Sequence, residues 1–432
     1  MKTEGSREVA AQLHFRVESR RTGRLGVRGE FGVRTAVGVL AMTLVGAAIV
    51  SGGCSREVGA TLNATASASV PVSASAPVSA SPSPMHSTSP TLEPRATVRT
   101  GSFSPTGAMT TTGRIDPSAT LLLDGRVLIA GGCKDGDAAI ATAELYDATS
   151  GTFSPTASMA HARCVPLAAR LLDGRVLLAG GDGGRSAELY DPKTEKFSAT
   201  GSMSTARQRG TATLLLDGRV LLAGGSEPTV SKDGNSLEHV ASAELYDPST
   251  GKFSLTGSIP MDGDFAATLL TDGRVLITCG SSANGEPAPA ELYNPATGRF
   301  SATGSMTEGC RSHSAVRLLD GRVLIVGLAS DTADIYDPAT DRFSATGPVI
   351  TARDDARATL LQDGRVLVSG GYTYTNNFYP APELFDPLSG TFTPAGSTTD
   401  PISTDTATLL LDGRVLITGL TTAPDTNGIY TP

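Results

Sequence analysis

Histidine, cysteine and carboxylate side chains carry most enzymatic chemistry, so they are the first candidates for a reactive centre. Between residue 100 and the C-terminus the chain has three histidines, His161, His239 and His313, which are widely separated in the sequence. There is no C-x-x-C spacing of the kind found in zinc sites, no serine triad signature and no phosphate-binding loop. We therefore expect no catalytic residues, no metal and no cofactor, and we favour a protein that is not an enzyme.

Aromatic side chains form the most distinctive cluster. Tyr372, Tyr374, Phe378 and Tyr379 lie within one loop-like segment, although the whole chain has only 21 phenylalanine and tyrosine residues and no tryptophan. Aromatic residues on an exposed loop are typical of protein hot spots and of platforms on which sugars stack. The alternative is that they cover their own loop and the strands below it.

Arginines form a second candidate set. Short polar segments that precede apolar strands contain Arg207, Arg209, Arg311 and Arg353. We predict that these arginines and the aromatic loop contact a ligand or partner. The competing interpretation of the arginines is a solvated rim.

The segments that position these residues belong to a repeat. The string DGRVL occurs seven times, beginning at Asp124, Asp173, Asp217, Asp272, Asp320, Asp363 and Asp412. A period of about 48 residues indicates an array of similar supersecondary units. No segment of the array has sustained helical periodicity.

Each unit reads as four short antiparallel strands. Asp-Gly between the first two strands is a strong hairpin signal, and we expect a two-residue type I′ turn there. The second strand, as in RVLIAGG, is continuously apolar, which indicates burial on both faces. Four strands in seven units predict an all-β, seven-bladed β-propeller with four-stranded antiparallel blades. We expect the arginine of DGRVL to contact the aspartate that ends the third strand, for example Arg126 with Asp147.

The unit resembles the Kelch repeat over residues 100–432. The resemblance rests on the glycine pair after the second strand, the E-x-Y of the third and the aromatic residue that opens the fourth. Phenylalanine replaces the usual tryptophan, and Leu328, Leu420 and Cys279 replace glycines of the pairs. The resemblance implies that the variable loops of one face contact partners. It also raises the alternative of a secreted carbohydrate-active enzyme, similar to galactose oxidase or to the sialic-acid mutarotases of this type.

Two cysteine pairs occupy equivalent places in the repeat. Cys133 and Cys279 follow second strands, and Cys164 and Cys310 begin the first strand of the next unit. Both sites lie on the same rim of adjacent blades, so we predict the disulfides Cys133–Cys164 and Cys279–Cys310. The other two connectivities remain open, and a metal site is the weaker interpretation.

The N-terminal residues read as an export signal. A basic stretch ends at Arg34 and precedes an apolar run at 35–50, which is short for a membrane span. SGGC, ending at Cys54, resembles a lipobox, so we predict a signal peptide at 1–54 and lipidation of Cys54. Cleavage without a lipid and an uncleaved anchor are the alternatives. Each places the remainder outside the cytoplasm, in the cell envelope or secreted.

Residues 55–99 form an Ala/Ser/Pro/Thr-rich segment, which we interpret as a disordered linker to a propeller at 100–432. Residues 1–34 carry eight basic and four acidic side chains, so the net charge of -8 leaves about -12 for the remainder. That charge argues against a nucleic-acid partner. We expect a monomer that contacts membranes only through its N-terminus.

The seventh unit lacks a fourth strand, because the chain ends at NGIYTP. The segment 101–109 has the sequence of a fourth strand with no third strand before it. We therefore predict that it completes the last blade and closes the ring. Together these features predict an exported binding propeller that recognises a protein or a glycan through its variable loop face.

Overall fold

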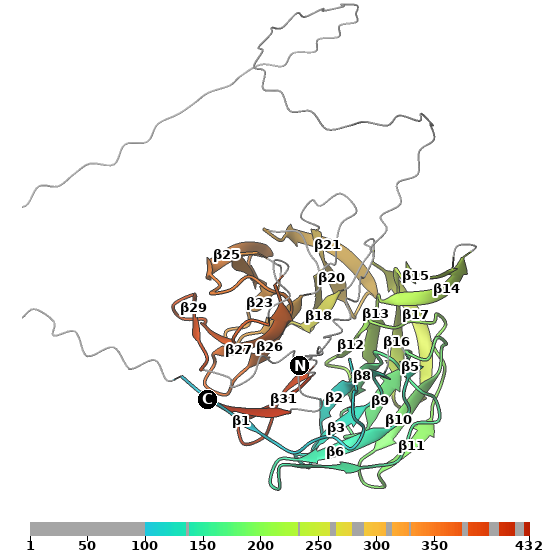
Figure 1. Cartoon of the computed structure of the whole chain (residues 1–432). Coiled ribbons are helices and arrows are strands. Elements are labelled where there is room, and N and C mark those ends of the chain that lie inside the picture. The colour runs from blue at the N-terminus through green and yellow to red at the C-terminus, as the bar shows by residue number, and fades with distance from the viewer. Residues whose placement is uncertain are drawn as a thin grey trace, which may run out of the picture. The chain divides into compact units, whose positions relative to one another are not determined.

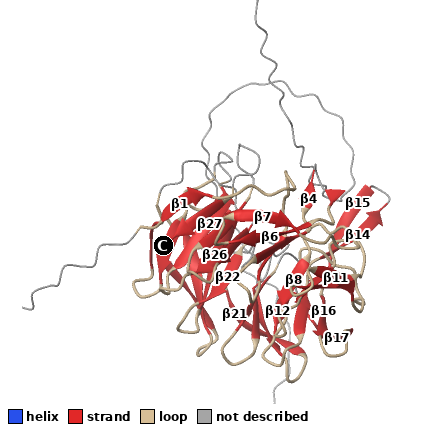
Figure 2. Cartoon of the chain, turned by 90° about the horizontal axis from the view of Figure 1, so that it is seen from below, coloured by secondary structure: helices blue, strands red, loops and turns tan. Residues whose placement is uncertain are grey.

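The computed structural model describes residues 100–134, 138–231, 234–259, 265–278, 289–307, 313–327, 330–373, 379–396, 406–419 and 427–432. All its regular elements are β-strands, and none of the described residues is helical (Figure 2). Accordingly, the described part of the chain contains no helix long and apolar enough to cross a membrane. Residues 90–432 form a compact unit by themselves.

Seven four-stranded antiparallel sheets are arranged as the blades of a propeller (Figure 1). Blade 1 comprises, from its first strand to its fourth, β2 (Ser118–Leu121), β3 (Val127–Ala130), β6 (Ala143–Asp147) and β7 (Thr152–Pro155). Blade 2 comprises, in the same order, β8 (Leu167–Arg170), β9 (Val176–Ala179), β10 (Ala187–Asp191) and β11 (Lys196–Ala199). Blade 3 comprises β12 (Thr211–Leu214), β13 (Val220–Ala223), β16 (Ser242–Asp247) and β17 (Lys252–Ser258). Blades 4 and 5 comprise β18 (Ala266–Leu269), β19 (Val275–Thr278), β20 (Pro289–Asn294) and β21 (Arg299–Ser305); and β22 (Ser314–Arg317), β23 (Val323–Val326), β24 (Thr332–Asp337) and β25 (Arg342–Pro348). Blades 6 and 7 comprise β26 (Asp354–Leu360), β27 (Val366–Tyr372), β28 (Glu383–Asp386) and β29 (Thr391–Pro394); and β30 (Thr406–Leu409), β31 (Val415–Thr418), β32 (Gly428–Thr431) and β1 (Ser102–Pro105). The predicted fold is therefore confirmed.

The ring closes as predicted. The first strands β2, β8, β12, β18, β22, β26 and β30 contact one another in that order, and β30 contacts β2 again. β1 pairs antiparallel with β32, with Ser102 opposite Thr431 and Pro105 opposite Gly428. The two ends of the propeller thus share one blade, and the pairing covers a strand edge that would otherwise be open to other chains.

Burial between blades explains the apolar second strands. Every residue of β3, β9, β13, β19 and β31 is buried. The third-strand aromatic residue packs against the fourth-strand phenylalanine of its own blade, with ring centroids 4.8 to 4.9 Å apart in all seven blades. Hydroxyl groups then join neighbouring blades, as where Thr106 Oγ1 lies 2.8 Å from the Tyr146 hydroxyl. A buried tyrosine therefore contributes apolar area and keeps a hydrogen-bond partner.

The turn at DGRVL differs from the predicted type I′ turn. The Leu122 amide donates to the Arg126 carbonyl and the Gly125 amide to the Leu122 carbonyl, so three residues form the loop. Only Gly125 has a positive φ, of 89°, whereas both central residues of a type I′ turn require one. These features fit a type I turn followed by a glycine bulge. The Asp124 carboxylate stabilises the turn by accepting from the Arg126 amide at 3.1 Å.

The predicted contact between Arg126 and Asp147 is wrong. Arg126 forms ion pairs with Asp124 in its own turn and with Glu195 in the next blade. It also donates to the Pro192 carbonyl of that blade at 3.4 Å. Arg219, Arg274, Arg322 and Arg414 reach a backbone carbonyl of another blade in the same way. The repeated arginine thus connects neighbouring blades, because its side chain extends across the interface instead of along its own sheet.

Candidate functional site

The two rims of the propeller differ in their loops. One rim carries the short DG and DPxTG turns, and we call it the turn face. The opposite rim carries the connections from second to third strands and from one blade to the next, and we call it the loop face. The loop face has two additional hairpins, β4 (Cys133–Lys134) with β5 (Ala138–Ala139) and β14 (Ser226–Ser231) with β15 (Gly234–His239). The pair β14 and β15 projects from the edge of the ring (Figure 1).

A buried arginine anchors the inter-blade connection in four blades. It lies ten residues before the aspartate of DGRVL and forms an ion pair with the third-strand glutamate of the same blade. The pairs are Arg114–Glu144, Arg163–Glu188, Arg207–Glu244 and Arg353–Glu383. All eight side chains are at most 4% exposed, so these pairs are shielded from solvent.

Arg207 illustrates the geometry. Its guanidinium donates to the Gly224 carbonyl at 3.0 Å, to the Ser242 carbonyl at 2.8 Å and to the Glu244 carboxylate at 3.0 Å. Glu244 accepts in addition from the amides of Ser204 and Thr205, which begin the connection. The pair therefore holds the path of the backbone that enters the channel mouth.

Electrostatics match this geometry. Burial lowers the pKa of Arg207, while the hydrogen bond and charge of Glu244 oppose that shift. Burial alone would raise the pKa of Glu144, but hydrogen bonds from Thr110 and Thr111 and the charge of Arg114 outweigh it and hold that pKa below its usual range. Glu144 is therefore ionised in the folded protein at neutral pH.

Two predicted site residues consequently lie in the interior. We expected Arg207 and Arg353 to contact a ligand at the rim, but both side chains are buried and bind the protein's own carbonyl and carboxylate groups. Neither guanidinium is accessible to a ligand in this structure. The physical reason is that a guanidinium has enough donors to satisfy several backbone carbonyls and one glutamate at once.

Glycine pairs permit the close approach of these connections. Gly180 and Gly181, after β9, have φ of 64° and 75°. A side chain at Gly180 would lie 2.0 Å from the Arg207 carbonyl oxygen, and the Gly181 amide donates to that oxygen at 3.0 Å. The same positions are Gly131–Gly132, Gly224–Gly225 and Gly370–Gly371 in other blades. The glycine pair is thus required where the next blade's connection crosses the end of the second strand.

The residues that follow the buried arginine surround the channel mouth. Eight residues before the aspartate of DGRVL lie Asp116, Val165, Arg209 and Asp355, with φ between 49° and 58°. A left-handed backbone is uncommon for residues other than glycine, and it is least expected for the β-branched Val165. Such strain occurs preferentially at ligand sites and persists where the surrounding structure fixes it.

These four residues line a cavity of about 290 Å³ at the channel mouth. Gly210, Phe265, His313 and Arg357 complete its wall. The lining comes from all of blades 1 to 6. One imidazole, two carboxylates and two guanidinium groups therefore face a single cavity.

The charged groups of the cavity are not equivalent. The Arg357 guanidinium donates to the Asp355 carboxylate at 2.8 Å, and His313 Nε2 lies 2.7 Å from Thr278 Oγ1. Within the described part of the chain, by contrast, the side chains of Asp116 and Arg209 form no hydrogen bond or ion pair. Arg209 is also exposed. These two groups therefore remain available to a ligand, and Arg209 is the predicted arginine that reaches the cavity.

The aromatic loop is described only in part. Tyr372 ends β27, and its hydroxyl donates to the Asp354 carboxylate at 3.5 Å, whereas Tyr379 is 36% exposed. Tyr374, Phe378 and Arg311 lie outside the described residues. The predicted binding role of this loop therefore stays a prediction.

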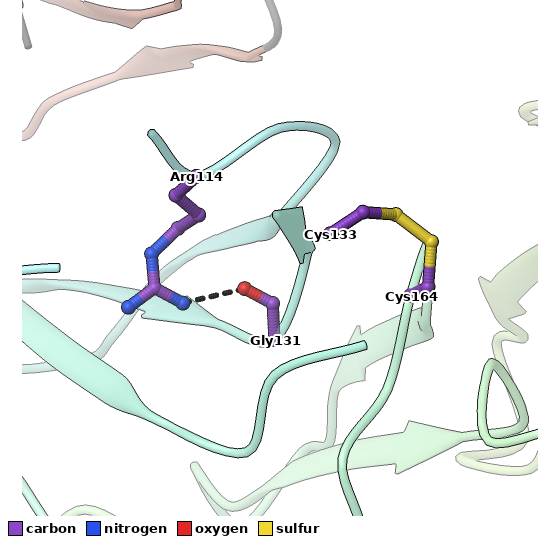
Figure 3. Close-up of a disulfide and its surroundings, with 4 residues drawn as sticks. All are labelled: Arg114, Gly131, Cys133 and Cys164. Atoms are coloured by element: carbon purple, nitrogen blue, oxygen red, sulfur yellow. Dashed lines mark hydrogen bonds between the residues drawn. A yellow bond between two sulfur atoms is a disulfide. The ribbon is translucent and has the colours of Figure 1, made fainter. Parts of the chain in front are cut away.

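A disulfide on the loop face joins the second-to-third-strand connection of blade 1 to the connection between blades 1 and 2. Cys133 and Cys164 are bonded, as predicted, with Cα atoms 4.9 Å apart (Figure 3). Figure 3 also shows the Arg114 guanidinium donating to the Gly131 carbonyl beside this bridge. Cys54, Cys279 and Cys310 lie outside the described residues, so the second predicted disulfide and the lipidation site are untested.

The remaining blades depart from the arginine–glutamate pattern. Position 262 is aspartate, 310 is cysteine and 402 is isoleucine, where the other blades have arginine. In blade 4 the corresponding Glu291 is buried, and burial raises its pKa. The Asp334 carboxylate of blade 5 accepts instead from the Thr307 amide at 2.8 Å. The ring is therefore asymmetric at its loop face despite its regular turns.

Comparison with known proteins supports the fold alone. No known sequence family and no curated protein matches the chain. Among solved structures it is similar to a fungal alcohol oxidase of the AA5 family in complex with copper, with 18% identity, a TM-score of 0.62 and coverage of 77% of each chain. Among the residues whose positions are described here, no three His, Cys, Asp or Glu side chains gather to hold a metal ion. We therefore derive no copper chemistry for this chain.

Proposed function

We propose that this chain is an exported, lipid-anchored propeller that recognises a glycan or a protein through its loop face, with the channel-mouth cavity as the centre of the site. In this proposal residues 1–54 are the signal peptide ending at the lipidated Cys54, and residues 55–99 are the linker. The Kelch-like repeat forms the binding scaffold. The mixed polar cavity carries the proposal, because it brings side chains from six blades to one position.

The cavity favours a sugar unit. Asp116 accepts hydrogen bonds from hydroxyl groups, Arg209 donates them, and Phe265 supplies an apolar wall. The lining has two acidic and two basic side chains, whose charges offset one another. A volume of about 290 Å³ is at the small end of the range for ligand pockets, which suits one unit of a longer chain.

A glycan array and a pull-down from envelope extracts test this proposal directly. The full chain should capture a glycan or a protein, and Asp116→Asn with Arg209→Gln should reduce the signal by about tenfold or more. A variant with Tyr372, Tyr374 and Tyr379 replaced by alanine tests the aromatic loop separately. Unchanged affinity in that variant would remove the loop from the site without removing the cavity.

A secreted carbohydrate-active enzyme is the second candidate function. It is favoured by His313 and the carboxylates of Asp116 and Asp355 lining one cavity, since these are groups that transfer protons in catalysis. Incubating the captured glycan with the chain and following it by NMR distinguishes the two functions. Turnover that is lost in His313→Gln supports the enzyme, whereas an unmodified glycan supports binding alone.

A further inference from the structure

The turn face exposes an arc of leucines around the channel. The residue before each Asp-Gly is Leu411 in blade 7, Leu123 in blade 1, Leu172 in blade 2 and Leu216 in blade 3. These four are between 62% and 70% exposed, although each lies in a tight turn of a well-packed blade. Large side chains that are this exposed at equivalent places in four consecutive blades gather apolar area on one face. Leu319 of blade 5 has the same place and is 72% exposed, but Thr271 of blade 4 separates it from the other four.

Folding does not require leucine at this position. Each of these side chains lies over the Asp-Gly glycine of the following blade, as Leu123 does over Gly174. Thr271 of blade 4 lies over Gly321 in the same way, and Gln362 of blade 6 lies over Gly413. Because threonine and glutamine occupy this turn position in other blades, packing against the next glycine does not require a leucine. The presence of four exposed leucines therefore has another cause.

The N-terminal segment joins the propeller on this same face. Fourth strands begin at the turn face, and Ser102 at the start of β1 pairs with Thr431 at the end of β32. Figure 1 shows β1 beside the C-terminus, in the blade that carries Leu411. The described chain begins at residue 100, just before β1, so the point at which residues 1–99 attach lies at the turn face.

The charged side chains next to the leucines are paired with one another. The aspartate beside each leucine forms an ion pair with the arginine of its own turn, as in Asp124–Arg126, Asp173–Arg175 and Asp217–Arg219. The charges directly beside the leucines are thus paired, whereas the Asp147, Asp191 and Asp247 carboxylates in the other turns of this face accept hydrogen bonds from backbone amides. A groove of about 450 Å³ beside Leu216, lined by the turns of blades 3 and 4, continues this surface.

We propose that the leucine arc of Leu411, Leu123, Leu172 and Leu216 rests on the lipid surface of the membrane that holds the N-terminus. This inference rests on the proposed anchoring. It places the turn face against the membrane and turns the cavity on the loop face outward, toward its ligand. The leucines enter the interface while the flanking arginines stay at its polar level.

Vesicle co-sedimentation of residues 90–432 tests the proposal, because this compact unit lacks the anchor and reports only on the face. The vesicles are made of phosphatidylcholine, because this lipid has no net charge and does not repel an acidic protein. The wild-type unit should partition onto them, and replacing all four leucines with threonine should lower the partition coefficient by about tenfold or more with an unchanged melting temperature. Leu255→Thr, on the outer strand β17 and 63% exposed, is the matched control and should bind as the wild type does.

Equal partitioning of the wild type and the four-leucine variant would overturn the proposal, as would no partitioning of the wild type. A dimer in solution that the same four substitutions abolish would also overturn it and would assign the arc to a second copy of the chain. Labelling of Cys54 by palmitate tests the anchor independently, and the glycan array tests the cavity independently. Failure of the leucine arc is therefore distinguishable from failure of the proposed function.

Discussion

Phe103, on the first strand of the propeller, packs against Tyr430 on the last, with ring centroids 4.8 Å apart. The six pairs within continuous blades have the same separation, between 4.8 and 4.9 Å. The blade assembled from both ends of the propeller therefore reproduces the packing of the other six. The ring is closed by side-chain packing as well as by the β1–β32 backbone pairing.

Removing this closure should destabilise the whole ring. Phe103→Ala should lower the free energy of unfolding by about 2 kcal/mol or more, and deletion of residues 101–109 by considerably more. Thermal unfolding measures both, with Ser102→Ala, whose side chain is exposed, as the control. An unaltered melting temperature after the deletion would contradict the closure.

Removing one partner of the buried Arg207–Glu244 ion pair should lower the free energy of unfolding strongly. Arg207→Met leaves Glu244 buried without its cation, and we expect a loss of about 3–5 kcal/mol in urea unfolding. The double variant with Glu244→Leu should recover only part of this loss, because the amides of Ser204 and Thr205 then lose their acceptor. Arg342→Met is a suitable control, since Arg342 is exposed at the start of β25 in blade 5. A loss below about 1 kcal/mol for Arg207→Met would show that the pair does not stabilise the connection.

Two buried glutamates should respond to pH in opposite directions. The pKa of Glu144 is lowered in the folded state, so its contribution to stability is present above its unfolded pKa and is lost as pH falls through the folded value. Burial raises the pKa of Glu291, so ionisation of this group costs stability as pH rises through the acidic range.

At pH 7, therefore, Glu144→Gln should lower the melting temperature and Glu291→Gln should raise it. Both differences should shrink toward pH 3.5. Melting curves of the two variants between pH 3.5 and 7 check the signs. A fall in the melting temperature of Glu291→Gln at pH 7 would show that this carboxylate is stabilised by a partner.

The disulfide should contribute through the loop that it closes. Cys133 and Cys164 are separated by 31 residues, for which chain entropy predicts about 3–4 kcal/mol. The double variant Cys133→Ser with Cys164→Ser should unfold at correspondingly lower urea concentration. A reductant should destabilise the wild type in the same way. Equal stability of wild type and double variant under oxidising conditions would contradict a structural role for this bridge.

The fold was predictable because the same four-strand sequence pattern recurs seven times along the chain. The spacing of DGRVL, the glycine pairs and the orphan fourth strand at Phe103 determine the blade count and the closure without any long-range information. The first disulfide followed from the same topology, since Cys133 and Cys164 lie on the same rim in adjacent blades.

The site was less predictable, because one loop segment contains both interior and surface arginines. Arg207 is buried and Arg209, two residues later, is exposed at the cavity, yet both looked alike as charges in a short polar segment. The sequence does contain a signal for the buried arginines. Arginine occurs ten residues before DGRVL only in the units that have both a glutamate in the third strand and two glycines after the second strand. The left-handed backbone at Val165 had no sequence signal, because β-branched residues disfavour it, whereas aspartate, as at Asp116, is among the residues enriched there.

Binding to a glycan array by the full chain and by its Asp116→Asn, Arg209→Gln variant tests whether the channel-mouth cavity is the glycan site. We expect the wild type to retain at least one glycan and the variant to lose about tenfold or more of that binding, with an unchanged melting temperature. Equal binding by the two proteins, or no glycan retained by the wild type, would contradict a glycan site at the channel mouth.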